Sequence, residues 1–340
     1  MVEYQYLYRK HFLSFVKFAF RILHPDERFY ESWHEPFLAN LLEFMWTIKE
    51  PLPSRKVIFN LPPGCLKTHL CAISLPMWIL GRDPRQSVLL VSETPEHART
   101  IQSACLELLE SPRYKAIFPR ARIKRVSRDI ELTYGGVIRH AGIGYTLPHR
   151  QSDLVVIDNP ESMHNLNPKR YGPLRELGRL LKHPDKGMIV VATRRLGPHD
   201  MSDFLYRCGG WGKLSMPAVA IEEKRWEFPP GDNYTQYRGE PLTWRIDWDD
   251  LEKRLHELGG EAFAYQYLQG EYVPCNTYGS CLRYNDDGHV VMVAGKPSLT
   301  QVAAKYLAGL RVEHEEMVEK IEEIIRTTKV KIPPEISSSV

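Results

Sequence analysis

The sequence has few cysteines, no long apolar run and almost no net charge, and each lack excludes a class of protein. Its six cysteines form no C-x-x-C pair and no zinc-type spacing with histidine, which argues against a disulfide framework or a structural metal and favours a reducing compartment. No segment approaches the length of a membrane span and no signal-peptide pattern opens the chain, so we expect a cytoplasmic protein with no membrane partner. With 45 basic and 42 acidic residues, a nucleic acid would have to be held by a local patch.

The order of the apolar segments predicts an α/β fold with a mostly parallel central sheet flanked by helices. Two helices are expected within residues 1–50, before the first strand. Buried apolar runs then predict strands at 57–59, 88–91, 154–157, 188–192 and 213–216. Helical periodicity lies between them at 67–80, 96–109, 174–181 and 200–206. Because strands and helices alternate, parallel pairing is expected.

Composition divides the chain into a large domain and a short appendage. We expect the domain to cover residues 1–274, with N-terminal helices at 1–50, a core at 51–220 and an extension at 221–274. Residues 275–340 predict a hairpin at 280–293, with its turn at 285–288, and an amphipathic helical appendage at 299–327.

A Lys-Thr pair at the start of a helix, just after the first buried strand, indicates a nucleotide site. Lys67 would reach the β and γ phosphates of ATP, and the Thr68 hydroxyl would hold Mg²⁺. The preceding loop of Pro63, Gly64, Cys65 and Leu66 would lie around the phosphates, and the backbone N–H groups that follow Pro63 would face them. The segment does not satisfy G-x-x-x-x-G-K-[ST], because leucines occupy both glycine positions, so an ordinary strand-to-helix turn is the alternative.

Two further strands end in polar residues that would meet the same sheet edge. Asp158 closes the strand at 154–157, where a carboxylate holds Mg²⁺ or its water beside such a loop, although a strand-terminal Asp also caps turns. Thr193 and Arg194 close the strand at 188–192, where a hydroxyl and a guanidinium would sense the γ-phosphate.

Taken in order, these motifs resemble the ATPase of the large terminase subunit of tailed double-stranded DNA phages. The resemblance covers about residues 30–274 and includes Trp33-His34, 60–68, 92–98, 153–160, Thr193-Arg194-Arg195, Asp200 and 263–267. In that family a Pro-Pro-Arg-x-x-Lys-Ser/Thr loop acts as Walker A, and an Asp-Asp/Glu-Pro segment closes the Walker B strand. The matching positions here are Pro62, Pro63, Lys67, Thr68, Asp158 and Pro160.

Two positions depart from the family pattern. Gly64 stands where the family often has arginine, so Arg150 or Arg194 is the candidate for stabilising charge during phosphoryl transfer, with a plain surface arginine as the alternative for each. Asn159 stands where the family has the acidic residue that orients the attacking water. An amide cannot accept a proton from water, so either hydrolysis is slow or Glu161 takes this place.

The resemblance implies an ATP-hydrolysing motor that drives double-stranded DNA into a procapsid in the host cytoplasm. It also implies a homo-oligomeric ring at the portal protein and a small terminase subunit that selects the DNA. Only about 65 residues follow Pro274, and a turn explains Asp286 and Asp287 better than metal binding, so we expect no nuclease activity in this chain and a nuclease on a separate chain. The basic run 120–128 would contact DNA phosphates or be a solvated face.

Two rival interpretations stay open at this point. A helicase-type enzyme fits less well, since neither an Asp-Glu-Ala-Asp strand end nor a second RecA-like domain is found. A degenerate prophage or regulatory ATP-binding protein with little turnover is the other alternative.

Overall fold

The chain divides into two compact units, Met1–Asn276 and Thr277–Val340. The computed structural model describes residues 2–50, 52–143, 151–162, 171–227, 233–270, 281–284 and 290–293. Within these residues, no helix is both long enough and apolar enough to span a membrane.

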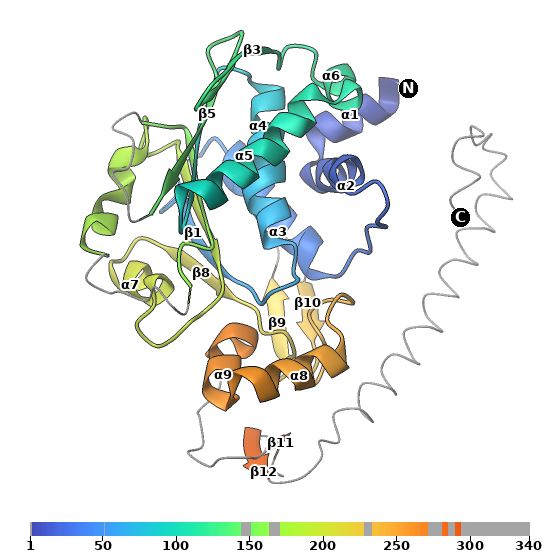
Figure 1. Cartoon of the computed structure of the whole chain (residues 1–340), viewed down its shortest axis with the longest axis vertical. Helices are drawn as coiled ribbons and strands as arrows, with labels where there is room; N and C mark the ends of the chain where they lie inside the picture. Colours follow the sequence, from blue (N-terminus) through green and yellow to red (C-terminus); the bar gives the residue numbers. More distant parts are fainter. Residues whose placement is uncertain are drawn as a thin grey trace, which may run out of the picture. The chain divides into compact units, whose positions relative to one another are not determined.

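An eight-stranded sheet forms the centre of the first unit (Figure 1), in the order β3-β4-β5-β2-β6-β7-β1-β8. The strands are β1 (Lys56–Asn60), β2 (Ser87–Ser92), β3 (Ile123–Val126), β4 (Ile130–Leu132), β5 (Val137–Gly142), β6 (Leu154–Asp158), β7 (Met188–Thr193) and β8 (Gly212–Ser215). All pairs from β5 to β8 are parallel, and only β3 and β4 add antiparallel pairs at one edge. The predicted mostly parallel α/β fold is confirmed.

Alternate side chains of the central strands pack into two separate apolar cores, because successive residues of a strand point to opposite faces. In β1, Val57 and Phe59 face one core and Ile58 faces the other. Strands β2, β6 and β7 are buried along their whole lengths, as expected for Val- and Ile-rich strands covered on both faces.

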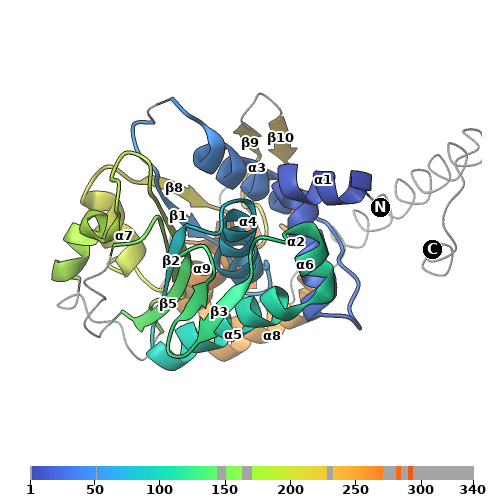
Figure 2. The same cartoon turned by 90° about the horizontal axis from the view of Figure 1, so that it is seen from above.

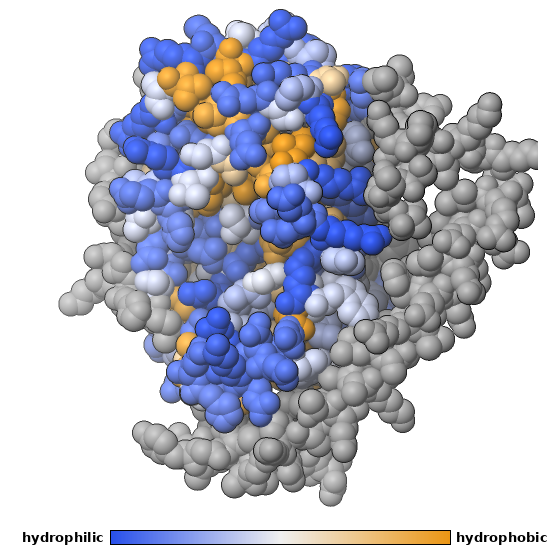
Figure 3. Space-filling view, turned by 45° about the vertical axis from the view of Figure 1, so that its right-hand side comes forward, coloured by the Kyte–Doolittle hydropathy of each residue, from blue (hydrophilic) through white to orange (hydrophobic). Residues whose placement is uncertain are grey.

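Helices cover both faces of this sheet, as Figures 1 and 2 show. One face carries α1 (Val2–Lys10), α2 (Phe12–Leu23), α3 (His34–Thr47), η1 (Thr68–Ser74), α4 (Leu75–Arg82), α5 (Pro95–Glu110) and α6 (Pro112–Ile117). The other face carries η3 (Gly172–Leu180) and α7 (Met201–Arg207). The side of the molecule seen in Figure 3 is hydrophilic over most of its coloured surface, with apolar groups gathered in its upper part.

Within residues 2–50, three helices precede the first strand, where two were expected. The apolar periodicity of residues 4–23 fits one helix, but the chain is interrupted there at His11, whose extended backbone caps α2 and whose ring accepts a hydrogen bond from the Ser14 N–H. The helix after the first strand begins with the π-helical turn η1 and continues directly into α4.

The extension consists of a two-stranded antiparallel sheet, β9 (Lys224–Glu227) and β10 (Asn233–Gln236), and two helices, α8 (Trp248–Leu258) and α9 (Gly260–Leu268). It is joined to the N-terminal helices by a stack of the Trp33 and Tyr234 rings, with centroids 4.5 Å apart. The Ala218 N–H also donates to the Tyr267 carbonyl, which ties the chain after β8 to α9.

In the second unit, β11 (Cys281–Tyr284) pairs antiparallel with β12 (Val290–Val293). The expected turn at 285–288 and the expected helix at 299–327 lie outside the described residues.

Candidate nucleotide site

The loop after β1 lies at the carboxyl edge of the sheet, next to the ends of β7 and β6. Asn60 pairs with Thr193, and Asp158 pairs with Ala192, so the three strand ends are adjacent. The first loop residue, Leu61, donates its N–H to the Thr193 carbonyl at 2.9 Å. This edge is where ligands bind in open parallel sheets.

The loop bends through two residues with left-handed backbone angles. Gly64 has φ +83°, a region that glycine adopts at no steric cost, and Leu66 has φ +48°. A positive φ is uncommon for a leucine, and such residues concentrate at functional sites. Leu66 therefore departs from the glycine pattern in sequence while its backbone takes the conformation that glycine favours.

The N–H groups of this loop are available to an anion. Among the described residues, the backbone N–H groups of Gly64, Leu66 and Lys67 donate to no protein acceptor. Unpaired N–H groups beside the start of a helix fit the oxygens of a phosphate chain. Burial raises the pKa of the adjacent Cys65 thiol to about 12, so Cys65 is a neutral packing group and not a nucleophile.

Lys67 is buried and its ammonium lies inside the loop. Its Nζ donates to the Pro62 carbonyl at 3.3 Å. Burial lowers the pKa of Lys67, and the nearby carboxylate of Asp158 opposes this shift. A buried cation that is held by one carbonyl has donors left for a further acceptor, which fits a terminal phosphate.

Thr68 and Asp158 form the second half of the site. The Thr68 hydroxyl donates to Asp158 Oδ2 at 2.8 Å and lies 3.1 Å from Oδ1. Burial raises the pKa of Asp158, and the hydrogen bond from Thr68 and the charge of Lys67 oppose that rise. A hydroxyl and a carboxylate are hard oxygen ligands, so the pair fits Mg²⁺ completed by phosphate oxygens and water. No group of three or more His, Cys, Asp or Glu side chains around one metal position is found in the part of the chain that the structure describes.

Of the residues after Asp158, Asn159 contacts the Asp158 carboxylate, whereas Glu161 contacts α7. Asn159 has φ +41°, and its side-chain amide donates to Asp158 Oδ2 at 3.1 Å. Glu161 is turned toward α7, because its oxygens accept from the Tyr171 hydroxyl and, at 2.8 Å, from the Met201 N–H. Burial raises the pKa of Glu161. Its described contacts fix the start of α7, and its catalytic role stays a prediction.

The arginines at the end of β7 have separate surroundings. Arg195 donates to Asp200 Oδ2 at 2.8 Å, and the same aspartate caps α7 through the Asp203 N–H. Arg194 adjoins Thr193, whose hydroxyl donates to the Arg194 carbonyl at 3.1 Å. Burial is the main cause that lowers the pKa of Lys67, and the positive charge of Arg194 lowers it further. Arg194 is therefore close enough to Lys67 for their charges to interact. Arg150 lies outside the described residues.

Two residues of this region were not assigned a role from the sequence. Glu93 directly follows β2, which pairs with β6, and the hydroxyl of its neighbour Ser92 donates to the Asp158 carbonyl at 2.7 Å. His34 lies with Nε2 at 3.5 Å from the Cys65 carbonyl and Nδ1 at 3.1 Å from the Leu242 carbonyl. Both residues lie in segments that carry the family resemblance, Trp33-His34 and 92–98, and the rule that selects Asp158, a carboxylate at the end of a buried run, also selects Glu93.

Comparisons with known proteins give matches among solved structures only. No family model and no curated protein matches the chain. The large terminase of bacteriophage HK97 matches with a TM-score of 0.46 and 11% identity, over 62% of this chain and 44% of that one. The large terminase of a thermophilic bacteriophage, in complex with ATP-γ-S, matches with a TM-score of 0.41 and 12% identity, over 72% of this chain and 60% of that one. The chain thus resembles large terminase structures and spans about half of their length.

Proposed function

We propose that this chain is the ATP-hydrolysing subunit of a motor that drives double-stranded phage DNA into a procapsid. The observation that carries the proposal is the contact of 2.8 Å between Thr68 and Asp158 beside the buried Lys67, at the carboxyl edge of a parallel sheet. The motif order of the sequence supports the choice of a packaging motor among ATPases of this fold.

In this proposal the loop binds the phosphates of ATP. The N–H groups of residues 64–67 hold the phosphate oxygens and Lys67 counters the charge of the γ-phosphate. Thr68 and Asp158 hold Mg²⁺, which, when bound, neutralises charge on the β and γ phosphates. Arg194 stabilises the charge that develops on the transferred group, since it lies at the end of β7 between the loop and Asp158.

Glu93 is proposed as the carboxylate that orients the attacking water. Asn159 cannot accept a proton, and both oxygens of Glu161 accept hydrogen bonds from Tyr171 and Met201. Glu93 follows the strand next to β6, so its backbone adjoins that of Asp158 at the same sheet edge. Its Oε1 accepts a hydrogen bond at 2.7 Å from Ser162, in the loop after β6.

The remaining parts of the proposal concern partners. DNA phosphates are contacted by the exposed β3 hairpin, where Lys124, Arg125 and Arg128 lie at the surface. The subunits form a homo-oligomeric ring at the portal protein in the host cytoplasm, a small terminase subunit selects the DNA, and a nuclease on a separate chain cuts it. In the same proposal, residues 1–274 form the ATPase domain and residues 275–340 form a short appendage.

The test is steady-state Mg²⁺-dependent ATP hydrolysis, measured with and without linear double-stranded DNA. We expect DNA-stimulated hydrolysis by the wild-type protein and its loss in Lys67→Ala, because the γ-phosphate loses its main counter-charge. The exposed Lys253 in α8 supplies the matched control, Lys253→Ala. Tight ATP binding without hydrolysis would instead favour a degenerate or regulatory ATP-binding protein, the second candidate, which Asn159 motivates.

A further inference from the structure

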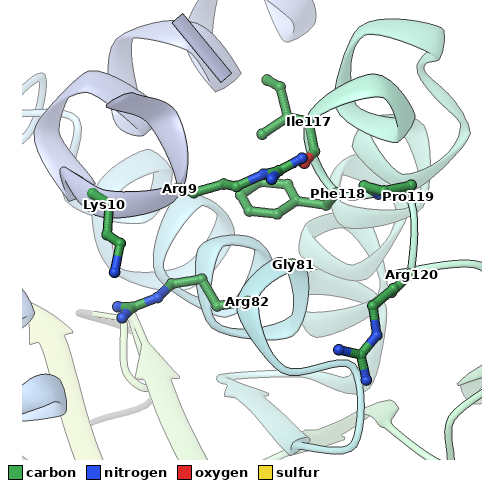
Figure 4. A pocket seen from close by; sticks show the side chains of 8 residues that line it. All are labelled: Arg9, Lys10, Gly81, Arg82, Ile117, Phe118, Pro119 and Arg120. Atoms are coloured by element: carbon green, nitrogen blue, oxygen red, sulfur yellow. The ribbon is translucent and has the colours of Figure 1, made fainter. Parts of the chain in front are cut away.

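We propose that a pocket at the far end of the η1–α4 helix binds a backbone phosphate of duplex DNA. The pocket, hereafter the cationic pocket, has a volume of about 260 Å³ and is lined by Arg9, Lys10, Gly81, Arg82, Ile117, Phe118, Pro119 and Arg120 (Figure 4). It uses the end of α1, the end of α4 and the chain after α6. Thr68 begins the same helix, so the nucleotide loop lies on the order of 20 Å away.

The lining contains four cationic side chains and no carboxylate. In Figure 4 the charged ends of Lys10 and Arg82 lie together on one side of Gly81, Arg9 crosses above toward Ile117, and Arg120 lies on the other side. Three of these side chains, Lys10, Arg82 and Arg120, are exposed. The pocket therefore carries concentrated positive charge in contact with solvent, which attracts a polyanion.

Aromatic rings hold the cations in place. Lys10 lies over the Tyr6 ring at 5.9 Å, Arg82 over the Trp78 ring at 4.3 Å, and Arg120 over the Tyr134 ring at 5.1 Å. A ring face orients a cation without cancelling its charge, as a carboxylate would do. Within the described part of the chain, none of the four cations lies within 4.0 Å of a carboxylate oxygen.

Arg9 and Gly81 fix two parts of the pocket lining. The Arg9 guanidinium donates from Nε to the Ile117 carbonyl at 2.6 Å, which ties α1 to the end of α6. A Cβ on Gly81 would lie 2.6 Å from the buried Phe118 ring, so glycine is required for this ring to close the base of the pocket. Partial burial lowers the pKa of Arg82, and the charge of nearby Glu43, which accepts from the Phe12 N–H, opposes the shift.

The charge pattern favours a DNA backbone as the occupant, an inference that rests on the proposed function. Arg120 begins the basic run that continues through the exposed Arg122, Lys124, Arg125 and Arg128. Duplex DNA carries one negative charge per about 1.7 Å of its axis, so a row of separated cations matches it better than it matches one small anion. Contacts to phosphates position a duplex without reading its sequence, as a translocated substrate requires.

The test is duplex DNA binding by the full chain, measured by fluorescence anisotropy over a range of salt from about 50 to about 200 mM. The variant Lys10→Gln/Arg82→Gln removes the two neighbouring charges, and Lys253→Gln/Arg254→Gln on α8 is the matched control. We expect the pocket variant to bind DNA about tenfold more weakly, with a salt slope smaller by about 2, and the control to match wild type. An unchanged affinity and slope in the pocket variant would overturn the proposal.

Two further measurements distinguish DNA binding in the pocket from binding of free phosphate, and a failure of the pocket from a failure of the proposed motor. Inorganic tripolyphosphate is titrated as a competitor of the DNA. If tripolyphosphate binds as tightly as a length of DNA with the same number of charges, the pocket is a site for free phosphates and the proposal is overturned. ATP hydrolysis without DNA is measured in both variants and should equal that of wild type. Weaker DNA binding by the pocket variant of a protein that hydrolyses no ATP would support the pocket and contradict the motor.

Discussion

The nucleotide loop and the cationic pocket lie at opposite ends of one helix and hold their positive charges in different ways. Lys67 is 7% exposed and is held by a carbonyl and a nearby carboxylate, whereas Lys10, Arg82 and Arg120 are exposed and are held over aromatic rings. A buried charge is little screened and binds in one geometry, while an exposed charge is screened by salt and tolerates many geometries. The nucleotide loop is therefore suited to a single chemical step, and the cationic pocket is suited to a long DNA backbone that moves past it.

The largest effect is expected from Asp158→Asn, which should separate the two regions completely. We expect Mg²⁺-dependent hydrolysis to fall roughly 10³-fold, because the amide keeps the shape of the side chain but loses the charge that holds the metal. DNA binding without nucleotide should not change, since the cationic pocket is at the other end of the helix. A parallel loss of DNA binding would contradict the separation.

The next effect concerns the water-orienting carboxylate. Glu93→Gln should lower kcat about 10²-fold with little change in ATP affinity, because it removes a proton acceptor and leaves the phosphate contacts in place. Glu161→Gln should lower the temperature of unfolding and leave kcat nearly unchanged, since Glu161 accepts hydrogen bonds from Tyr171 and the Met201 N–H. Steady-state kinetics and thermal unfolding of both variants show which carboxylate orients the water. A large loss of kcat in Glu161→Gln with little loss in Glu93→Gln would assign this role to Glu161.

The helix between the two regions should be sensitive to acid through His69. Burial lowers the pKa of His69 from 6.5 to about 4, against the hydrogen bond to the Val16 carbonyl, so its contribution to stability is present above pH 6.5 and is lost as the pH falls through 4. This difference corresponds to about 3 kcal/mol of the free energy of unfolding. Urea unfolding should therefore show a shallower pH dependence in His69→Gln than in wild type, with the remaining slope carried partly by His34. Equal slopes would show that His69 does not act in this way.

The smallest effect should come from the left-handed residue of the loop. Leu66→Gly should keep the affinity for ATP, because glycine adopts φ +48° freely, whereas Leu66→Val should weaken it roughly tenfold, because a β-branched residue resists this angle. Equilibrium binding of ATP to both variants measures the difference. Equal affinities would mean that the loop does not need this conformation to hold phosphates.

The strand ends of the site could be predicted from the sequence, because a buried apolar run that stops at a polar residue marks the end of a central strand. This rule indicates Asp158 after β6, Thr193 at the end of β7 and, in the same way, Glu93 after β2. The left-handed backbone at Leu66 could not be predicted, since nothing in a leucine indicates a positive φ.

Other features depend on contacts between distant segments. The carboxylate of Glu161 is engaged by residues 10 and 40 positions away, and the cationic pocket joins Arg9, Arg82 and Arg120 from three elements. No periodicity or spacing encodes such contacts, because they are set by how the helices pack on the sheet.

The most direct test of the nucleotide site is the dependence of ATP affinity on Mg²⁺ in wild type and in Thr68→Ala. The contact of 2.8 Å between Thr68 and Asp158 predicts that Mg²⁺ strengthens ATP binding by the wild-type protein, and that this gain is lost in Thr68→Ala while the affinity for metal-free ATP is kept. The titration is done by calorimetry with and without Mg²⁺. An equal gain from Mg²⁺ in both proteins would contradict the assignment of Thr68 and Asp158 as the metal-binding pair.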